Sequence, residues 1–115
     1  MINSVNIMGR EIKIKQLSSK EIKEAKARGD VDSPESEELK AWYNPFEQTI
    51  FISKELSTES FNRILLHELT HACFAIGGLT HLLTGKQEEA ICDMTENFLD
   101  LFKNKEFMQM LSSKG

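Results

Sequence analysis

Two histidines stand four residues apart in the segment His67-Glu68-Leu69-Thr70-His71. Residues four apart lie on the same face of an α-helix, so both imidazoles can bind one metal ion. The glutamate after the first histidine projects about 100° away, where it can act on a metal-bound water without being a ligand. This HExxH spacing is a zinc signature when it lies on a helix. The sequence therefore predicts a Zn²⁺ site with His67 and His71 as ligands and Glu68 as the general base.

The residues around this motif favour a helix. Residues 61–76 contain neither proline nor glycine, and Ser57 or Thr58 is a suitable N-cap. Gly77 and Gly78 follow, as is typical of a helix C-terminus. The segment is apolar on most sides, which predicts a buried helix. The alternative interpretation is a chance pattern, with core histidines that bond to backbone carbonyls.

A catalytic zinc site has three protein ligands and one open position, so a third ligand must follow. The downstream candidates are His81, Glu88, Glu89 and Asp93. One known arrangement uses a histidine six residues after the second motif histidine, and the glycine at position 77 excludes it. The other common solution is a glutamate from a following helix.

The segment E-A-I-C-D at residues 89–93, together with the HExxH motif, resembles the thermolysin-type zinc peptidases, or gluzincins. The resemblance implies that Glu89 is the third ligand and that Asp93 holds the other ring nitrogen of His67. Such a carboxylate contact fixes the tautomer of a metal-binding histidine. Glu88 replaces Glu89 as the ligand if the helix is rotated. The alternative is a solvated helix face formed by the acidic row Glu89, Asp93, Glu96 and Asp100.

The segment A-W-Y-N at residues 41–44 is similar to the edge strand that aligns the substrate backbone in the same family. By this resemblance Ala41 and Trp42 lie along the substrate, whereas Lys40 stands where the family has asparagine and that contact is not carried over. The resemblance covers residues 41–44 and 67–93. The short chain resembles the minimal gluzincins of bacteria and mobile elements, some of which cleave or destabilise phage-type repressors.

Peptide hydrolysis needs a further donor for the developing oxyanion. Two residues are candidates for this role. His81 lies in the expected loop at residues 79–85, and Tyr43 lies on the expected edge strand. A surface histidine with no role is the alternative for His81.

The remaining pattern predicts a strand, a short surface helix, a hairpin and two long helices. Ile12 and Ile14 alternate with lysines, which indicates a half-buried strand. The expected elements are a strand at 11–17, a helix at 19–28, hairpin strands at 39–43 and 49–53, the motif helix and a last helix at 86–103. An acidic segment at 30–38 is expected to be a solvated loop. The fold class is α+β, with a small mixed sheet and hairpin packed on the HExxH helix and a second ligand-bearing helix, as in zincins.

Composition narrows the function classes. The 115 residues suit a single domain, and the net charge of −4 argues against a nucleic-acid partner. No apolar run is long enough for a membrane span, and residues 1–10 lack the apolar stretch of a signal peptide. The two cysteines are too few for a disulfide framework, so a soluble cytoplasmic protein with reduced thiols is expected. Cys73 is expected on the core side of the motif helix, and neither Cys73 nor Cys92 is expected to be a ligand.

The function predicted from these patterns is a zinc metallopeptidase acting on a protein or peptide substrate. One alternative is a zinc-binding regulatory domain of the same fold that has lost turnover. Another is a helical interaction module that binds no metal.

Overall fold

The computed structural model of the protein describes residues 4–31 and 38–113, so residues 32–37 of the acidic segment lie outside the described part. Four strands form one mixed sheet in the order β1-β2-β4-β3. The strands are β1 (Ser4–Ile7), β2 (Arg10–Leu17), β3 (Ala41–Asn44) and β4 (Thr49–Ser53). β2 and β4 run parallel, whereas the two outer pairs are antiparallel. The predicted α+β class, the hairpin and the small mixed sheet are confirmed.

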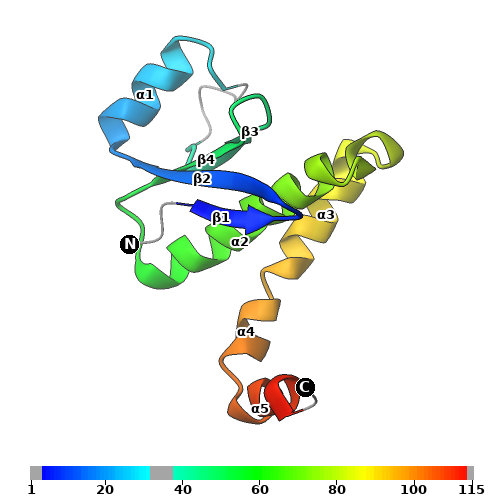
Figure 1. Ribbon diagram of the computed structural model, residues 1–115. Coiled ribbons are helices and arrows are strands. Elements are labelled where there is room, and N and C mark those ends of the chain that lie inside the picture. The colour runs from blue at the N-terminus through cyan, green and yellow to red at the C-terminus, as the bar shows by residue number, and fades with distance from the viewer. Residues whose placement is uncertain (1–3, 32–37, 114–115) are drawn as a thin grey trace.

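Helices lie against one face of this sheet, beside it and beyond it (Figure 1). They are α1 (Ser19–Ala27), α2 (Thr58–Ile76), the short 3₁₀ helix η1 (Leu79–Leu82), α3 (Gly85–Thr95), α4 (Phe98–Phe102) and α5 (Lys105–Ser113). α2 lies behind the sheet in Figure 1 and packs on β3, on β4 and on α3. The hairpin and α3 therefore both border the helix that carries the HExxH motif.

The core lies between the sheet and α2. Its centre is formed by four isoleucines of the two middle strands and one alanine of α2: Ile12, Ile14, Ile50, Ile52 and Ala72. The lysines that alternate with the β2 isoleucines point to the opposite face and are exposed, as the period of two requires. The half-buried strand predicted at residues 11–17 is confirmed.

The ends of α2 follow from local signals. The Ser57 hydroxyl accepts a hydrogen bond from the backbone N–H of Ser60 at 3.2 Å, which satisfies one N-terminal donor. Gly77 caps the C-terminus, and Gly78 adopts the left-handed conformation with φ of 73°, which glycine enters at no steric cost. The predicted motif helix and both of its ends are confirmed.

One strand was not predicted. β1 pairs with β2 through a two-residue turn at Met8 and Gly9, both with positive φ. The Asn6 side chain accepts a hydrogen bond from the Gly9 N–H at 3.0 Å. Only Val5 and Ile7 alternate in this strand, which is too short a pattern to separate from a loop.

The single last helix predicted at residues 86–103 is wrong, because the chain turns more tightly after Thr95. The Thr95 hydroxyl donates to the carbonyl of Cys92 at 2.7 Å, and the Asn97 N–H bonds to the carbonyl of Met94, three residues back. Such i to i−3 bonds break the α-helical ladder. The segment is therefore divided into α3 and α4, and η1 occupies part of the predicted loop at 79–85.

The core position predicted for Cys73 is also wrong. The core-facing side of α2 includes Leu65, Leu69 and Ala72. Cys73 lies about 100° further round the helix from Ala72, and its side chain is exposed. α2 is not buried on most sides either, since only Glu68 and Ala72 are buried and its other apolar residues are half-buried apart from the exposed Cys73.

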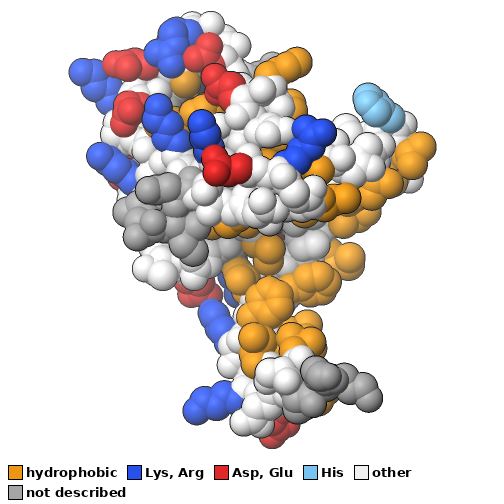
Figure 2. Space-filling view, in the orientation of Figure 1, with side chains coloured by type: hydrophobic (Ala, Val, Ile, Leu, Met, Phe, Trp, Pro, Cys, Tyr) orange, Lys and Arg blue, Asp and Glu red, His pale blue; other side chains and the backbone are white. Residues whose placement is uncertain are grey.

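α4 and α5 extend away from the sheet (Figure 1). Large apolar side chains stay exposed there, and Figure 2 shows hydrophobic side chains gathered over this side of the molecule. They include Phe98, Leu101, Phe102, Met108 and Leu111. Even so, none of the helices in residues 4–31 and 38–113 has the length and hydrophobicity that crossing a membrane requires.

Truncating the centre of the sheet should unfold the protein more easily. Ile50 is 0% exposed and lies opposite Ile14 on β2 and Tyr43 on β3. Ile50→Ala should lower the free energy of unfolding by about 2–5 kcal/mol, through lost burial and the cavity left behind. Urea denaturation measures this loss. Phe46→Ala, at a side chain that is 97% exposed, is the control and should change the free energy of unfolding by less than about 0.5 kcal/mol. Equal losses in the two variants would contradict this placement of the core.

Candidate metal centre

Two histidine side chains of α2 converge on one carboxylate of α3. The Nε2 atom of His67 lies 2.5 Å from one oxygen of Glu89, and the Nε2 atom of His71 lies 3.2 Å from the other oxygen. The spacing of four residues places both rings on the same side of α2, and the antiparallel return of the chain through η1 brings α3 alongside. The structure therefore brings His67, His71 and Glu89 together as the sequence predicts.

The other ring nitrogens are held by further carboxylates. The Nδ1 atom of His67 lies 3.0 Å from Glu96 and 3.3 Å from Asp93. The Nδ1 atom of His71 lies 2.5 Å from Glu88. In the tautomer that metal binding through Nε2 requires, the ring proton is on Nδ1, where these carboxylates can accept a hydrogen bond from it, and the lone pair is on Nε2. Both Nε2 lone pairs then point toward Glu89.

This arrangement leaves acceptors facing acceptors. With the ring protons on Nδ1, the Nε2 lone pairs of His67 and His71 oppose the carboxylate oxygens of Glu89 at 2.5 and 3.2 Å. A proton or a cation between them is needed to make these contacts favourable. Two imidazoles and one carboxylate are also a donor set that zinc prefers. The residues present therefore fit a divalent metal ion.

The local charge supports the same fit. Five carboxylates face the two imidazoles: Glu68, Glu88, Glu89, Asp93 and Glu96. Burial alone lowers the pKa of His67, but nearby Glu68, Glu89 and Glu96 outweigh it and the pKa is raised overall. A divalent cation held by two neutral imidazoles offsets part of this negative charge, as two ring protons also would.

Glu68 differs from the other carboxylates in its burial. It is 9% exposed, and this burial raises the pKa of its carboxyl, against the opposing effect of His71 and His67. Its side chain lines the same cavity as the two histidines and Glu89. No oxygen of Glu68 is among the carboxylate contacts of either ring. The structure thus places Glu68 beside the converging donors and not among them.

The acidic row Glu89, Asp93, Glu96 and Asp100 lies alongside α2 and contacts its basic side chains. Glu96 contacts His67, and Asp100 contacts Arg63 at 3.2 Å. Arg63, His67 and His71 are spaced by four residues on α2, so they meet successive carboxylates of the returning chain. The row is half-exposed, yet its members pair with basic side chains of α2. It is therefore an interface between the helices and not only a solvated face.

A cavity of about 440 Å³ connects these side chains to the edge of the sheet. β3 is the last strand of the sheet, and Ala41, Trp42 and Tyr43 line the cavity with the histidines. The Trp42 ring also stacks on Phe51 with ring centroids 4.9 Å apart, which fixes its position. Burial raises the pKa of Tyr43, so its hydroxyl keeps its proton. The predicted edge strand therefore borders the donor cluster.

The structure places His81 differently from Tyr43. His81 lies in η1 and its side chain is exposed. Among the described residues that line the cavity, η1 contributes Thr80 and not His81. Of the two predicted oxyanion donors, only Tyr43 lies at the cavity.

Cys92 lies closer to the histidines than the sequence suggested. It is 0% exposed, and its sulfur and one nitrogen of each of His67 and His71 all lie within 4.8 Å of one another. Burial raises the pKa of the Cys92 thiol to about 12, and the nearby Glu89 and Glu88 add to this. The thiol is therefore protonated and unreactive as long as no metal displaces the proton.

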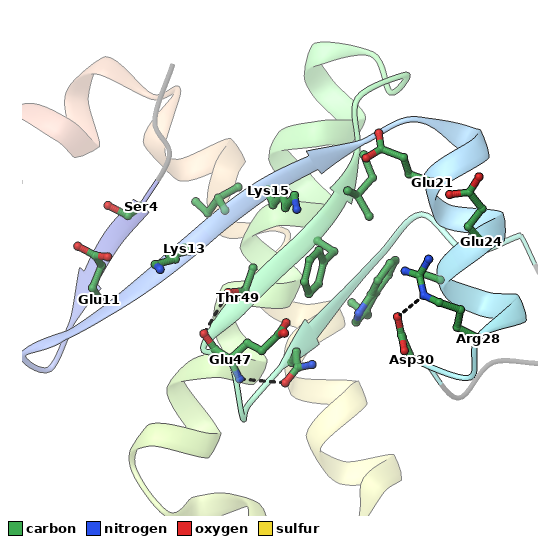
Figure 3. A pocket seen from close by; sticks show the side chains of 16 residues that line it. Ser4, Glu11, Lys13, Lys15, Glu21, Glu24, Arg28, Asp30, Glu47 and Thr49 are labelled. Atoms are coloured by element: carbon green, nitrogen blue, oxygen red, sulfur yellow. Dashed lines mark hydrogen bonds and ion pairs between the residues drawn. The ribbon is translucent and has the colours of Figure 1, made fainter.

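A larger hollow lies on the face of the sheet opposite α2, with a volume of about 1070 Å³. Figure 3 shows side chains of both signs around it, among them Lys13, Lys15 and Glu21, with Arg28 paired to Asp30 at 3.0 Å. The described residues that line it include no histidine and no cysteine. Metal-binding chemistry is therefore concentrated in the smaller cavity.

Sequence reasoning named Asp93 as a partner of the His67 ring, which the 3.3 Å contact bears out, but it missed Glu96 and the contact of Glu88 with His71. Glu96 follows Glu89 by seven residues, two helical turns, so the spacing placed it on the correct face without showing what it contacts. Glu88, the alternative ligand in a rotated helix, lies instead on the Nδ1 side of His71.

Comparison with family models, curated proteins and solved structures finds no match to this chain. The interpretation of the site therefore rests on its geometry.

Proposed function

We propose that the protein is a zinc metallopeptidase with a zincin-like arrangement of sheet, motif helix and second ligand-bearing helix. The observation that carries the proposal is the convergence of both Nε2 atoms on Glu89, at 2.5 and 3.2 Å, beside the buried Glu68. His67, His71 and Glu89 would hold the ion, and three protein ligands leave a position open for substrate or water. The resemblance to gluzincins supports the same assignment.

In the proposed peptide hydrolysis, the zinc ion and the side chains of the protein have different tasks. When bound, zinc polarises a carbonyl and makes water more acidic. Glu68 lines the cavity and can accept a proton from the attacking water, then return it to the leaving amine. Its raised pKa brings the carboxyl nearer to the range in which both transfers are efficient. Asp93, Glu96 and Glu88 orient the imidazoles and move no proton of the substrate.

The substrate class follows from the edge of the sheet. An extended peptide can add to an edge strand through backbone hydrogen bonds, and β3 is such a strand. Ala41 and Trp42 line the cavity that leads to His67 and Glu68. The Tyr43 hydroxyl is the donor that we assign to the developing oxyanion. A polypeptide chain is therefore the proposed substrate, and the two free cysteines suit the reducing cytoplasm.

The helix interface also supports a second candidate, a module without metal. Arg63 pairs with Asp100 at 3.2 Å and extends the row of contacts beyond the histidines. Protonated histidines would continue that row as ion pairs, and the raised pKa of His67 is consistent with this. A third possibility, a zinc-binding domain without turnover, shares the metal with the peptidase and the lack of catalysis with the module. Metal content separates the module without metal from the other two.

Protein purified without added metal should contain about one zinc per chain, the stoichiometry of a three-ligand site. His71→Ala should abolish this zinc, because it removes one of the converging donors. Elemental analysis measures both. His81→Ala is the matched control, since His81 is exposed on η1, and it should retain full zinc. Full metal content in the variant that lacks both His67 and His71 would place the site elsewhere.

A further inference from the structure

We propose that Cys92 is a metal ligand that approaches from the core side, so that His67, His71 and Cys92 form a second, thiolate-containing donor set for thiophilic divalent ions. The inference rests on the proposed zinc site and deepens it. It departs from the sequence-based expectation that neither cysteine is a ligand. It also assigns a role to a buried nucleophilic side chain that peptide hydrolysis does not use.

The position of Cys92 on α3 carries the proposal. Cys92 follows Glu89 by three residues, so both side chains project from the same side of α3 toward α2. The Cys92 sulfur and one ring nitrogen of each histidine lie within 4.8 Å of one another, which small shifts of side chains can bring to one ion. Within the described part of the chain, no hydrogen bond satisfies this thiol.

The two donor sets approach the histidines from different environments. Glu89 is 53% exposed and reaches the rings from the solvent side, whereas Cys92 is 0% exposed and reaches them from the core. A thiolate is a soft ligand and a carboxylate is a hard one, so the identity of the ion decides which of them binds. If both bind together with the two histidines, four protein ligands close the site, as in structural zinc sites.

Metal binding at Cys92 requires loss of its proton. The S–H bond breaks, the sulfur keeps the electron pair and donates it to the ion, and the proton leaves to solvent. No oxidant or reductant takes part. His67, His71 and Glu89 alone leave a position open for water, whereas Cys92 as a fourth ligand closes the site and excludes water. The same chain could then hold the ion in an open, catalytic coordination by three ligands or in a closed, inactive coordination by four.

Co²⁺ distinguishes the ligand sets, because it gives visible d–d bands in any tetrahedral site and an ultraviolet charge-transfer band only with a thiolate. The full chain carrying Cys73→Ser is the sharpest sample, since Cys92 is then its only thiol. We expect this variant, loaded with Co²⁺, to show both sets of bands. Wild type should show the same spectrum, because Cys73 is exposed and belongs to no donor cluster among the described residues.

Cys92→Ser is the complementary variant. It should keep the visible bands through His67, His71 and Glu89 and lose the charge-transfer band. If this variant does not fold, the Cys73→Ser spectrum still decides, because that variant leaves the core side chain intact. Visible bands without a charge-transfer band in Cys73→Ser would overturn the role of Cys92 and leave the proposed peptidase standing. Absence of all Co²⁺ bands would overturn both.

Discussion

Replacing Glu68 with glutamine should lower the turnover of the proposed peptidase by about two to four orders of magnitude, the usual contribution of a general acid–base group. Glutamine keeps the size of the side chain and much of its hydrogen bonding, but it cannot accept the proton of the attacking water. Zinc content and melting temperature should be nearly unchanged, because Glu68 makes none of the ring contacts that hold His67 and His71. The effect should therefore appear in kcat with the site intact.

The measurement needs a substrate and a matched control. A library of unfolded proteins offers peptide bonds in many sequence contexts, and self-cleavage of the chain offers a second substrate. Glu59→Gln is the control, because Glu59 lies on the same helix and its side chain is 68% exposed. It should leave turnover unchanged. If zinc-loaded wild type cuts no substrate, the regulatory domain without turnover takes precedence over the peptidase.

Local signals explain why the motif helix could be predicted from the sequence. Ser57 and Gly77 mark its ends through bonds within a few residues, and the spacing of the histidines fixes their common face. The hairpin was predictable for the same reason, since a β-branched run follows a turn at Asn44 and Pro45. β1 escaped prediction because its two alternating residues carry too little pattern. The break after Thr95 escaped because apolar spacing continues across it.

The parts of the site that needed the structure depend on how α3 is rotated against α2. Spacing placed Glu89 near the histidines, but spacing cannot say which oxygen meets which nitrogen. A rotation of one residue about the α3 axis, about 100°, would exchange Glu88 for Glu89. The observed rotation turns Glu89 toward both Nε2 atoms and leaves Glu88 on the far side of His71. The same rotation buries Cys92 against the rings, which sequence reasoning had no means to predict.

Among the carboxylates of α3, Glu89 should contribute most to metal affinity. It is the carboxylate that faces both Nε2 atoms, whereas Glu88 and Asp93 contact Nδ1 atoms. Removing a carboxylate that orients a metal-binding histidine typically weakens binding by about 10–100-fold, and this is the loss expected for Glu88→Gln. Glu89→Gln removes the anionic group that we propose as the third ligand and should weaken binding by more. Competition with a chromophoric chelator measures these affinities.

The control for this series is Asp100→Asn, because Asp100 continues the acidic row and contacts Arg63 but neither histidine. It should leave zinc affinity unchanged. Glu68→Gln losing the metal while Glu89→Gln retains it would reverse the roles of the two carboxylates.

Two carboxylates, Asp93 and Glu96, should share the orientation of the His67 ring. Its Nδ1 atom lies 3.0 Å from Glu96 and 3.3 Å from Asp93, so either carboxylate can accept a hydrogen bond from the ring N–H when the other is absent. Asp93→Asn and Glu96→Gln should therefore each weaken zinc binding less than Glu88→Gln, since His71 has one Nδ1 carboxylate in the described structure. The double variant should reach the full loss of about 10–100-fold expected for an unsupported imidazole. A full loss from Asp93→Asn alone would show instead that Asp93 holds His67 without help from Glu96, as the resemblance to gluzincins implies.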